Sequence, residues 1–151
     1  MAKQETINQW LKIANMDLES AKILMKNMYP APFEIICYHC QQAAEKFLKT
    51  ISISLGMEVV KTHDILKVLD QYVNQIEIPQ EIVVIAGTLT QFATKTRYPE
   101  IIEVDENQAK LAIAQAEKVK EWTEKIIANK LKDEKIEKSD KKDDTSGAST
   151  D

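Results

Sequence analysis

The stretch FEIICYHCQQAAEKFLKTISISL, from Phe33 to Leu55, decides the fold because it forms one long helical pattern. Its apolar residues recur at steps of three and four, which places them on a single face of an α-helix. Gly56 follows, and glycine readily takes the left-handed conformation that closes a helix. The sequence therefore predicts an amphipathic helix over residues 33–55 whose buried stripe is Ile36, Cys40, Ala43, Phe47 and Ile51.

The same spacing recurs on both sides of this stretch, between breaks at the prolines. It predicts a first helix over residues 6–28 that opens with a Thr6–Gln9 capping box. Farther along, it predicts a short helix over 62–74 capped by Thr62, a helix from Pro79 toward Arg97, and a long last helix opened by Asp105 and Gln108. Because the helical face continues through Thr90, Phe92 and Ala93 without a turn signal, the run Val83-Val84-Ile85 is assigned to a helix and not to a strand.

These elements predict an all-α fold. Since the links between helices are short, we expect an up-and-down bundle of four long helices plus one short helix, occupying residues 1–131 as a single domain. Beyond Leu131 the chain changes to Lys, Asp, Glu, Ser, Thr and Gly, with Ile136 almost the only large apolar residue. Such a composition cannot offset the entropy of ordering, so residues 132–151 are predicted to be a disordered charged tail.

Composition narrows the class of protein. The chain has 151 residues, 44% apolar and 29% charged, as expected for one soluble globular domain. It contains no run near the ~18 apolar residues of a membrane span, and its first residues lack an apolar signal core. With two cysteines only, a cytoplasmic protein with reduced thiols and no membrane association is expected. The net charge of −4 disfavours indiscriminate nucleic-acid binding.

A polar strip on the predicted helix 33–55 is the main candidate site. His39, Gln42, Lys46 and Lys49 are spaced three, four and three residues apart, so their side chains lie along one line of the helix, with Gln41 and Glu45 beside it. An imidazole, a carboxamide and two ammonium groups in a row can bind a phosphate and contact a base edge. The alternative is that the strip is simply the solvated side of an amphipathic helix.

Cys37 and Cys40 form a C-x-x-C pattern, which can signal a metal or redox site. A zinc site needs four ligands, and apart from the adjacent His39 the chain offers only the distant His63. A redox motif belongs to a βαβ setting that this sequence lacks. We therefore expect two buried helical cysteines and no metal site.

Two further places stand out. In Thr62-His63-Asp64, capping explains Thr62 and Asp64, whereas His63 could act as a base oriented by a carboxylate or simply hydrogen-bond across a helix junction. Arg97 is the only arginine in the chain, which suggests a fixed phosphate or carboxylate partner, and the neighbouring Tyr98 could stack on a base or pack on the bundle. The alternative for Arg97 is a structural ion pair, for instance with Asp17 or Glu45.

Four motifs together resemble a known family. They are Trp10 with Ala14, Asp17-Leu18 and Ala21; Cys40-Gln41-Gln42-Ala43-Ala44-Glu45-Lys46-Phe47-Leu48-Lys49; Thr62-His63-Asp64-Ile65-Leu66; and Arg97-Tyr98-Pro99-Glu100. In this order they resemble the HEPN family of prokaryotic helical domains, over about Thr6 to Leu131. The resemblance implies a bundle of four or five helices, often a homodimer, and frequently a partnership with a separate minimal nucleotidyltransferase chain. Many such pairs act as toxin and antitoxin.

The resemblance also implies nucleotide binding, and one large branch of the family cleaves RNA without a metal, using an Arg followed four to six residues later by a His. Here Arg97 matches the arginine, but no His follows it. The sequence therefore favours a non-catalytic module that needs no cofactor and binds an ATP-like nucleotide and a partner through His39, Gln42, Lys46, Lys49, His63, Arg97 and Tyr98. The alternatives are an atypical ribonuclease, with Arg97 on the phosphate and His63 or His39 transferring the proton, and a scaffold that only dimerises and presents helices.

Overall fold

The computed structural model describes residues 2–93 and 103–145, and within these ranges the protein is all-helical. The helices are α1 (Ala2–Asn27), α2 (Phe33–Ser54), α3 (Ile65–Asp70), α4 (Gln80–Thr90) and α5 (Glu106–Thr145). The all-α prediction is confirmed. Three of the helices are long, at 26, 22 and 40 residues, whereas α4 has only 11.

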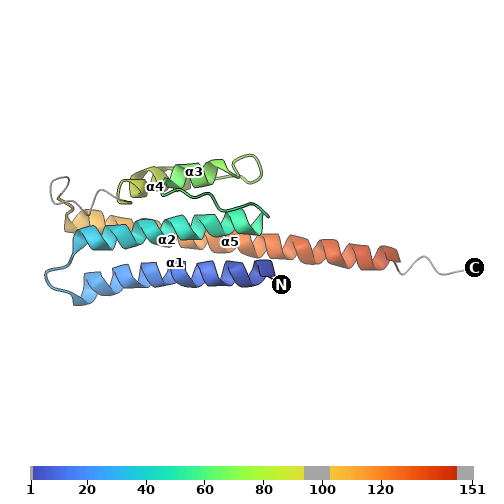
Figure 1. Cartoon of the computed structure of the whole chain (residues 1–151), viewed down its shortest axis with the longest axis horizontal. Helices are drawn as coiled ribbons and strands as arrows, with labels where there is room; N and C mark the ends of the chain where they lie inside the picture. The colour runs from blue at the N-terminus through green and yellow to red at the C-terminus, as the bar shows by residue number, and fades with distance from the viewer. Residues whose placement is uncertain (1, 94–102, 146–151) are drawn as a thin grey trace, which may run out of the picture.

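Helix α2 lies at the centre of the bundle. It contacts each of the other four helices, with α1 on one side, α3 and α4 on the other and α5 alongside (Figure 1). Most of its residues are therefore buried, in agreement with the predicted stripe, and the core is built around them: Ala14, Leu18 and Ala21 of α1, Ile36, Cys40, Ala43, Phe47 and Ile51 of α2, and Ala109, Ala112, Ala116 and Val119 of α5. Within the described residues no helix combines the length and the apolar character needed to cross a membrane.

The predicted end of α2 is confirmed. The helix stops at Ser54, Leu55 is its C-cap, and Gly56 takes a positive φ of 77°. The amides of Leu55, Gly56 and Met57 donate to carbonyls of the last helical turn. A side chain at position 56 would be strained in this left-handed conformation, which is why glycine stands there.

Helices α3 and α4 both begin later in the chain than the sequence predicts. Asp64, and not Thr62, is the N-cap of α3, because its carboxylate accepts from the Leu66 amide at 3.1 Å. Thr62 instead caps the preceding turn, its Oγ1 accepting from the Asp64 amide at 3.0 Å. Pro79 is the N-cap of α4 and not its first helical residue.

Helix α4 ends at Thr90, earlier than the predicted end near Arg97. The next amides, of Phe92 and Ala93, donate to carbonyls three residues back, so the chain tightens into a turn instead of continuing an α-helix. Thr90 contributes to this ending, since its Oγ1 bonds back to the Ala86 carbonyl and also accepts from the Ile65 amide of α3. Arg97 and Tyr98 lie outside the described residues.

Helix α5 begins as predicted and ends later. Asp105 and Gln108 form a reciprocal capping box, with backbone-to-side-chain hydrogen bonds of 2.9 and 2.8 Å. The helix then runs to Thr145, so residues 132–145 are helical where the sequence analysis placed a disordered tail, and α5 projects beyond the bundle (Figure 1). Glu137 stands four residues before Lys141, a spacing that supports an exposed helix and that composition alone does not reveal.

Candidate functional site on helix α2

Polar side chains on α2 form two hydrogen-bonded networks, one with α1 and one with residues 62–63. Gln41, Glu45 and Lys49 are buried, which is unusual for polar and charged residues, whereas His39 and Lys46 are partly exposed. Burying charge is costly unless each group is paired and hydrogen-bonded. Each network supplies such partners from a different neighbouring segment.

The first network joins α1 to α2 through Asp17. One carboxylate oxygen contacts His39 Nδ1 at 3.1 Å, and the other accepts a hydrogen bond from Lys46 Nζ. The Asp17 side chain is largely buried at the helix seam. Since a carboxylate only accepts hydrogen bonds, Nδ1 of His39 is the donor, and the ring presents Nε2 away from Asp17.

The second network is centred on Glu45. Its Oε1 accepts from Lys49 Nζ at 2.6 Å, and its Oε2 accepts from Gln41 Nε2 at 2.9 Å and from His63 Nδ1 at 3.0 Å. Burial alone would raise the pKa of this carboxyl, but the hydrogen bonds from Lys49, Gln41 and His63 outweigh burial and hold the pKa below its usual range. Glu45 is therefore a buried carboxylate that accepts hydrogen bonds at both of its oxygens.

The same network fixes the segment that follows α2. Lys49 Nζ donates to the Thr62 carbonyl at 2.8 Å, and Gln41 Nε2 lies 3.3 Å from the His63 carbonyl. Two α2 side chains thus hold the backbone of residues 62–63 against the helix. This explains how His63, whose side chain is 65% exposed, comes to lie over a carboxylate that is 5% exposed.

The predicted strip is divided between these networks. His39 and Lys46 join α1, while Lys49 is buried against Glu45 and the 62–63 backbone. Gln42 joins the Glu45 network, since its Nε2 donates to Gln41 Oε1 at 2.7 Å. The structure therefore brings His39, Gln42, Lys46, Lys49 and His63 onto one face but leaves only some of them accessible.

Two residues of the site have larger roles than the sequence indicates. Apart from its place in the first family motif, the sequence suggests Asp17 as a partner for Arg97, yet in the structure Asp17 contacts His39 and Lys46. The sequence does contain a signal for this role, because Asp17 is an acidic residue next to Leu18, which is fully buried. Glu45, the other partner suggested for Arg97, already accepts three hydrogen bonds from described residues.

The C-x-x-C pattern belongs to the core. Cys37 and Cys40 are free and fully buried, as predicted. Burial raises the pKa of Cys37 to about 12 and raises the pKa of Cys40 as well, so neither thiol ionises readily. Among the described residues no group of three or more His, Cys, Asp or Glu side chains is placed to hold a metal ion.

The exposed part of the site offers hydrogen-bonding groups in fixed positions. Within residues 2–93 and 103–145, the Nε2 atoms of His39 and His63 make no hydrogen bond, while each Nδ1 is held by a carboxylate. A ring oriented in this way can donate to or accept from a ligand, or transfer a proton. Lys46 adds a partly exposed positive charge beside His39.

Comparisons with known proteins agree with this architecture. The HEPN domain family matches residues 7–126. A crystal structure of the Thermus thermophilus protein TT1696 is similar at 25% identity over 80% of this chain and 97% of that chain, with a TM-score of 0.71. An archaeal HEPN homologue is similar at 26% identity over 80% and 97%, with a TM-score of 0.64.

A third structure, of a HEPN domain protein from Thermotoga maritima, shares the fold at 22% identity over 82% of this chain and 95% of that chain, with a TM-score of 0.53. None of the curated proteins compared with the chain matches it significantly. The family match covers most of the chain and includes all of α2 with both of its polar networks. The chain therefore belongs to the HEPN domain family.

Proposed function

We propose that this HEPN domain is a non-catalytic module that binds a nucleotide and a partner chain in the cytoplasm. The observation that carries the proposal is the pair of carboxylate-anchored networks on α2, which hold His39, Lys46 and His63 in fixed orientations at a partly exposed face. Fixing these groups in advance lowers the entropy lost when a ligand binds.

The groups on this face suit a nucleotide. Lys46 supplies positive charge for a phosphate, and Gln42 with the two imidazoles supplies donors and acceptors for a base or sugar edge. Arg97 and Tyr98 are further candidates from their sequence positions, as a guanidinium for phosphate and a ring for stacking. An ATP-like nucleotide fits this set, and no cofactor is required.

The partner part of the proposal comes from family membership. HEPN domains frequently pair with a minimal nucleotidyltransferase in toxin–antitoxin systems, and many are homodimers. We propose the same two-component arrangement here, with two copies of the chain placing their α2 faces near the dimer interface. Sedimentation equilibrium tests the dimer, and a monomer at micromolar concentration would contradict it.

The nucleotide is tested by thermal-shift titration with ATP, GTP and AMP. A ligand that binds only the folded state raises the melting temperature, so a rise is expected for the wild type and a smaller rise for Lys46→Gln and Arg97→Ala. The matched control is Lys118→Gln, which removes the same charge from a lysine paired with Glu81 on the α4–α5 side. The nucleotide site is contradicted if no nucleotide raises the melting temperature, or if Lys118→Gln reduces the rise as much as the site variants do.

A specific observation supports a second candidate, an atypical ribonuclease. His63 is exposed yet has its Nδ1 held by the ionised Glu45, the arrangement that orients a general acid or base. This candidate requires RNA cleavage that survives repurification and is lost in both Arg97→Ala and His63→Ala. Cleavage that is unchanged in these variants would identify a contaminating nuclease.

Partner binding separates the module from a simple scaffold. A minimal nucleotidyltransferase chain, if encoded beside this gene, is mixed with the protein and the complex is measured by calorimetry. The module predicts that nucleotide changes the affinity and that Lys46→Ala and Arg97→Ala remove this effect. A scaffold predicts that both variants bind the partner as the wild type does, with or without nucleotide.

A further inference from the structure

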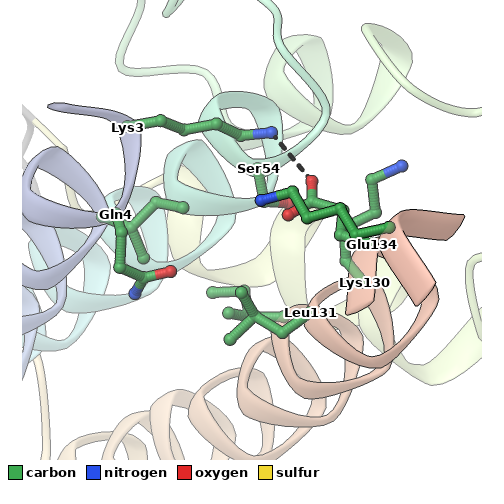
Figure 2. Close-up of a pocket in the computed structure, with 9 residues that line it drawn as sticks. Lys3, Gln4, Ser54, Lys130, Leu131 and Glu134 are labelled. Carbon is green, nitrogen blue, oxygen red and sulfur yellow. Dashed lines mark hydrogen bonds and ion pairs between the residues drawn. The ribbon is translucent and has the colours of Figure 1, made fainter. Parts of the chain in front are cut away.

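A separate hollow lies at the end of the bundle from which α5 projects. There the start of α1, the end of α2 and the outer part of α5 enclose a cavity of about 430 Å³ (Figure 2). This volume lies in the range of small-molecule sites, which is roughly 300–1,000 Å³. Its lining combines apolar side chains, among them Ile7, Ile127 and Leu131, with charged side chains from α1 and α5.

The floor and the rim of this hollow differ in chemistry. Ile7, Ile127 and Ser54 are buried and make a mainly apolar floor. The rim carries three lysines and a single carboxylate, Glu134, so its formal charge is positive in a chain whose net charge is −4. Positive charge gathered around an apolar depression in an acidic protein selects for anions.

Among the described residues, one rim lysine forms an ion pair and the other two do not. Lys3 Nζ is 3.2 Å from Glu134 Oε1, an ion pair that joins α1 to α5 across the mouth of the hollow (Figure 2). This contact offsets the repulsion that Glu134 would exert on an incoming anion. Lys130 and Lys138 make no ion pair or hydrogen bond within residues 2–93 and 103–145, so their ammonium groups can turn toward a ligand.

We propose that this hollow binds a small phosphate monoester with an apolar body. A phosphate monoester carries close to two negative charges at neutral pH and has three acceptor oxygens, which match two or three lysine donors. The apolar part would cover Leu131, whose side chain is exposed, and the removal of this apolar surface from water favours binding. Lysine stems are flexible, so the rim can close on one phosphate group.

The hollow is distinct from the α2 site. Ser54 lies eight residues after Lys46, the nearest partly exposed residue of the α2 site, which is roughly 12 Å along the same helix at 1.5 Å per residue. Its rim residues Lys3, Lys130, Glu134 and Lys138 all lie outside residues 7–126, the part that matches the HEPN domain. The proposal therefore concerns a feature of this chain's own terminal segments, and it stands whether or not the α2 face binds a nucleotide.

The test is an NMR titration of the ¹⁵N-labelled full chain with phenyl phosphate as the probe, with inorganic phosphate and phenol in parallel. Shifts are expected at the amides of Ser54, Ile127 and Leu131, with phenyl phosphate binding more tightly than either fragment. Lys130→Gln/Lys138→Gln is expected to weaken binding about tenfold, since two charge contacts are lost. Lys3→Gln is also expected to weaken it, because Glu134 is then unpaired.

The matched control is Lys132→Gln/Lys135→Gln, which makes the same charge change on the same helix at positions that do not line the hollow. It is expected to bind phenyl phosphate within twofold of the wild type. The proposal is overturned if phenyl phosphate causes no shifts at Ser54, Ile127 and Leu131, if the shifts fall on residues 39–46 instead, or if both double variants lose the same affinity.

Discussion

His63 Nδ1 lies 3.0 Å from Glu45 Oε2, so an imidazole on the surface is joined to a carboxylate in the interior. The link works because Lys49 and Gln41 first hold the backbone of residues 62–63 against α2. A conformational change of His63 would therefore alter the buried ion pair between Glu45 and Lys49. Because Glu45 has its pKa held below the usual range, the network also makes stability depend on pH.

Replacing Glu45 with Gln is expected to destabilise the fold strongly. The substitution leaves the Lys49 ammonium buried without its carboxylate, and breaking one half of a buried ion pair costs about 3–5 kcal/mol. Urea denaturation measures the loss in free energy of unfolding. The control is Glu81→Gln, which breaks the exposed pair with Lys118 and is expected to cost about 1 kcal/mol or less. Equal losses in the two variants would contradict the buried network.

The lowered pKa of Glu45 predicts a loss of stability in acid. A carboxyl whose pKa is lower when folded than when unfolded stabilises the fold above its unfolded pKa, about 4.3, and loses this contribution as the pH falls through the folded pKa. Urea midpoints from pH 6 to pH 3 should fall more steeply for the wild type than for Glu45→Gln. Parallel curves would show that Glu45 titrates alike in both states.

Tyr72→Phe is expected to cost about 1 kcal/mol. The Tyr72 hydroxyl is fully buried and donates to the Leu48 carbonyl of α2 at 3.2 Å, and burial raises the pKa of this phenol. The loss is that of a single hydrogen bond, because Phe fills the ring space. Differential scanning calorimetry measures it as a drop in melting temperature. A variant as stable as the wild type would show that water or a neighbouring group satisfies this carbonyl.

Both cysteines are expected to resist modification in the native protein. Their burial keeps the thiols protonated, with the pKa of Cys37 near 12, and the thiolate is the reactive form. Ellman's reagent should label them slowly in buffer and rapidly in urea. The matched control is a cysteine introduced at the exposed position Met16, in a Cys37→Ala/Cys40→Ala background. Fast native labelling of the wild type would mean that α2 opens readily.

Removing residues 132–151 is expected to leave the bundle folded. The exposed Lys3–Glu134 ion pair joins residues 132–140 of α5 to the bundle, and such pairs contribute about 1 kcal/mol or less. Circular dichroism should show the loss of a helical segment with a melting temperature changed by a few degrees. Unfolding of the shortened chain would show that the projection holds the bundle together.

The predictions from sequence succeeded where a local pattern determines the structure. The α2 stripe, the left-handed Gly56 and the Asp105–Gln108 capping box follow from spacing and residue type, and all three are present. Helix ends were less predictable. α4 ends at Thr90, whose hydroxyl accepts a hydrogen bond from the Ile65 amide of α3, a tertiary contact that the α4 sequence does not reveal.

The site was predictable as a helix face but not as a set of partners. Spacing placed His39, Lys46 and Lys49 on one side of α2. It could not show that Asp17 would take the first two while Glu45 took the third, because this depends on how α1 and the 62–63 backbone pack. Helical periodicity predicts which residues share a face of α2. The segments that pack against that face determine which of them stay accessible.

The central place of α2 has a consequence for how the protein opens. Since α1, α3, α4 and α5 all pack on this one helix, it cannot detach without disrupting the contacts of every other element. Its amides are therefore expected to exchange hydrogen only through global unfolding, while the ends of α1 and α5 exchange through local fraying. The bundle thus behaves as a single cooperative unit, and its polar face is carried by the segment of the chain that is slowest to exchange.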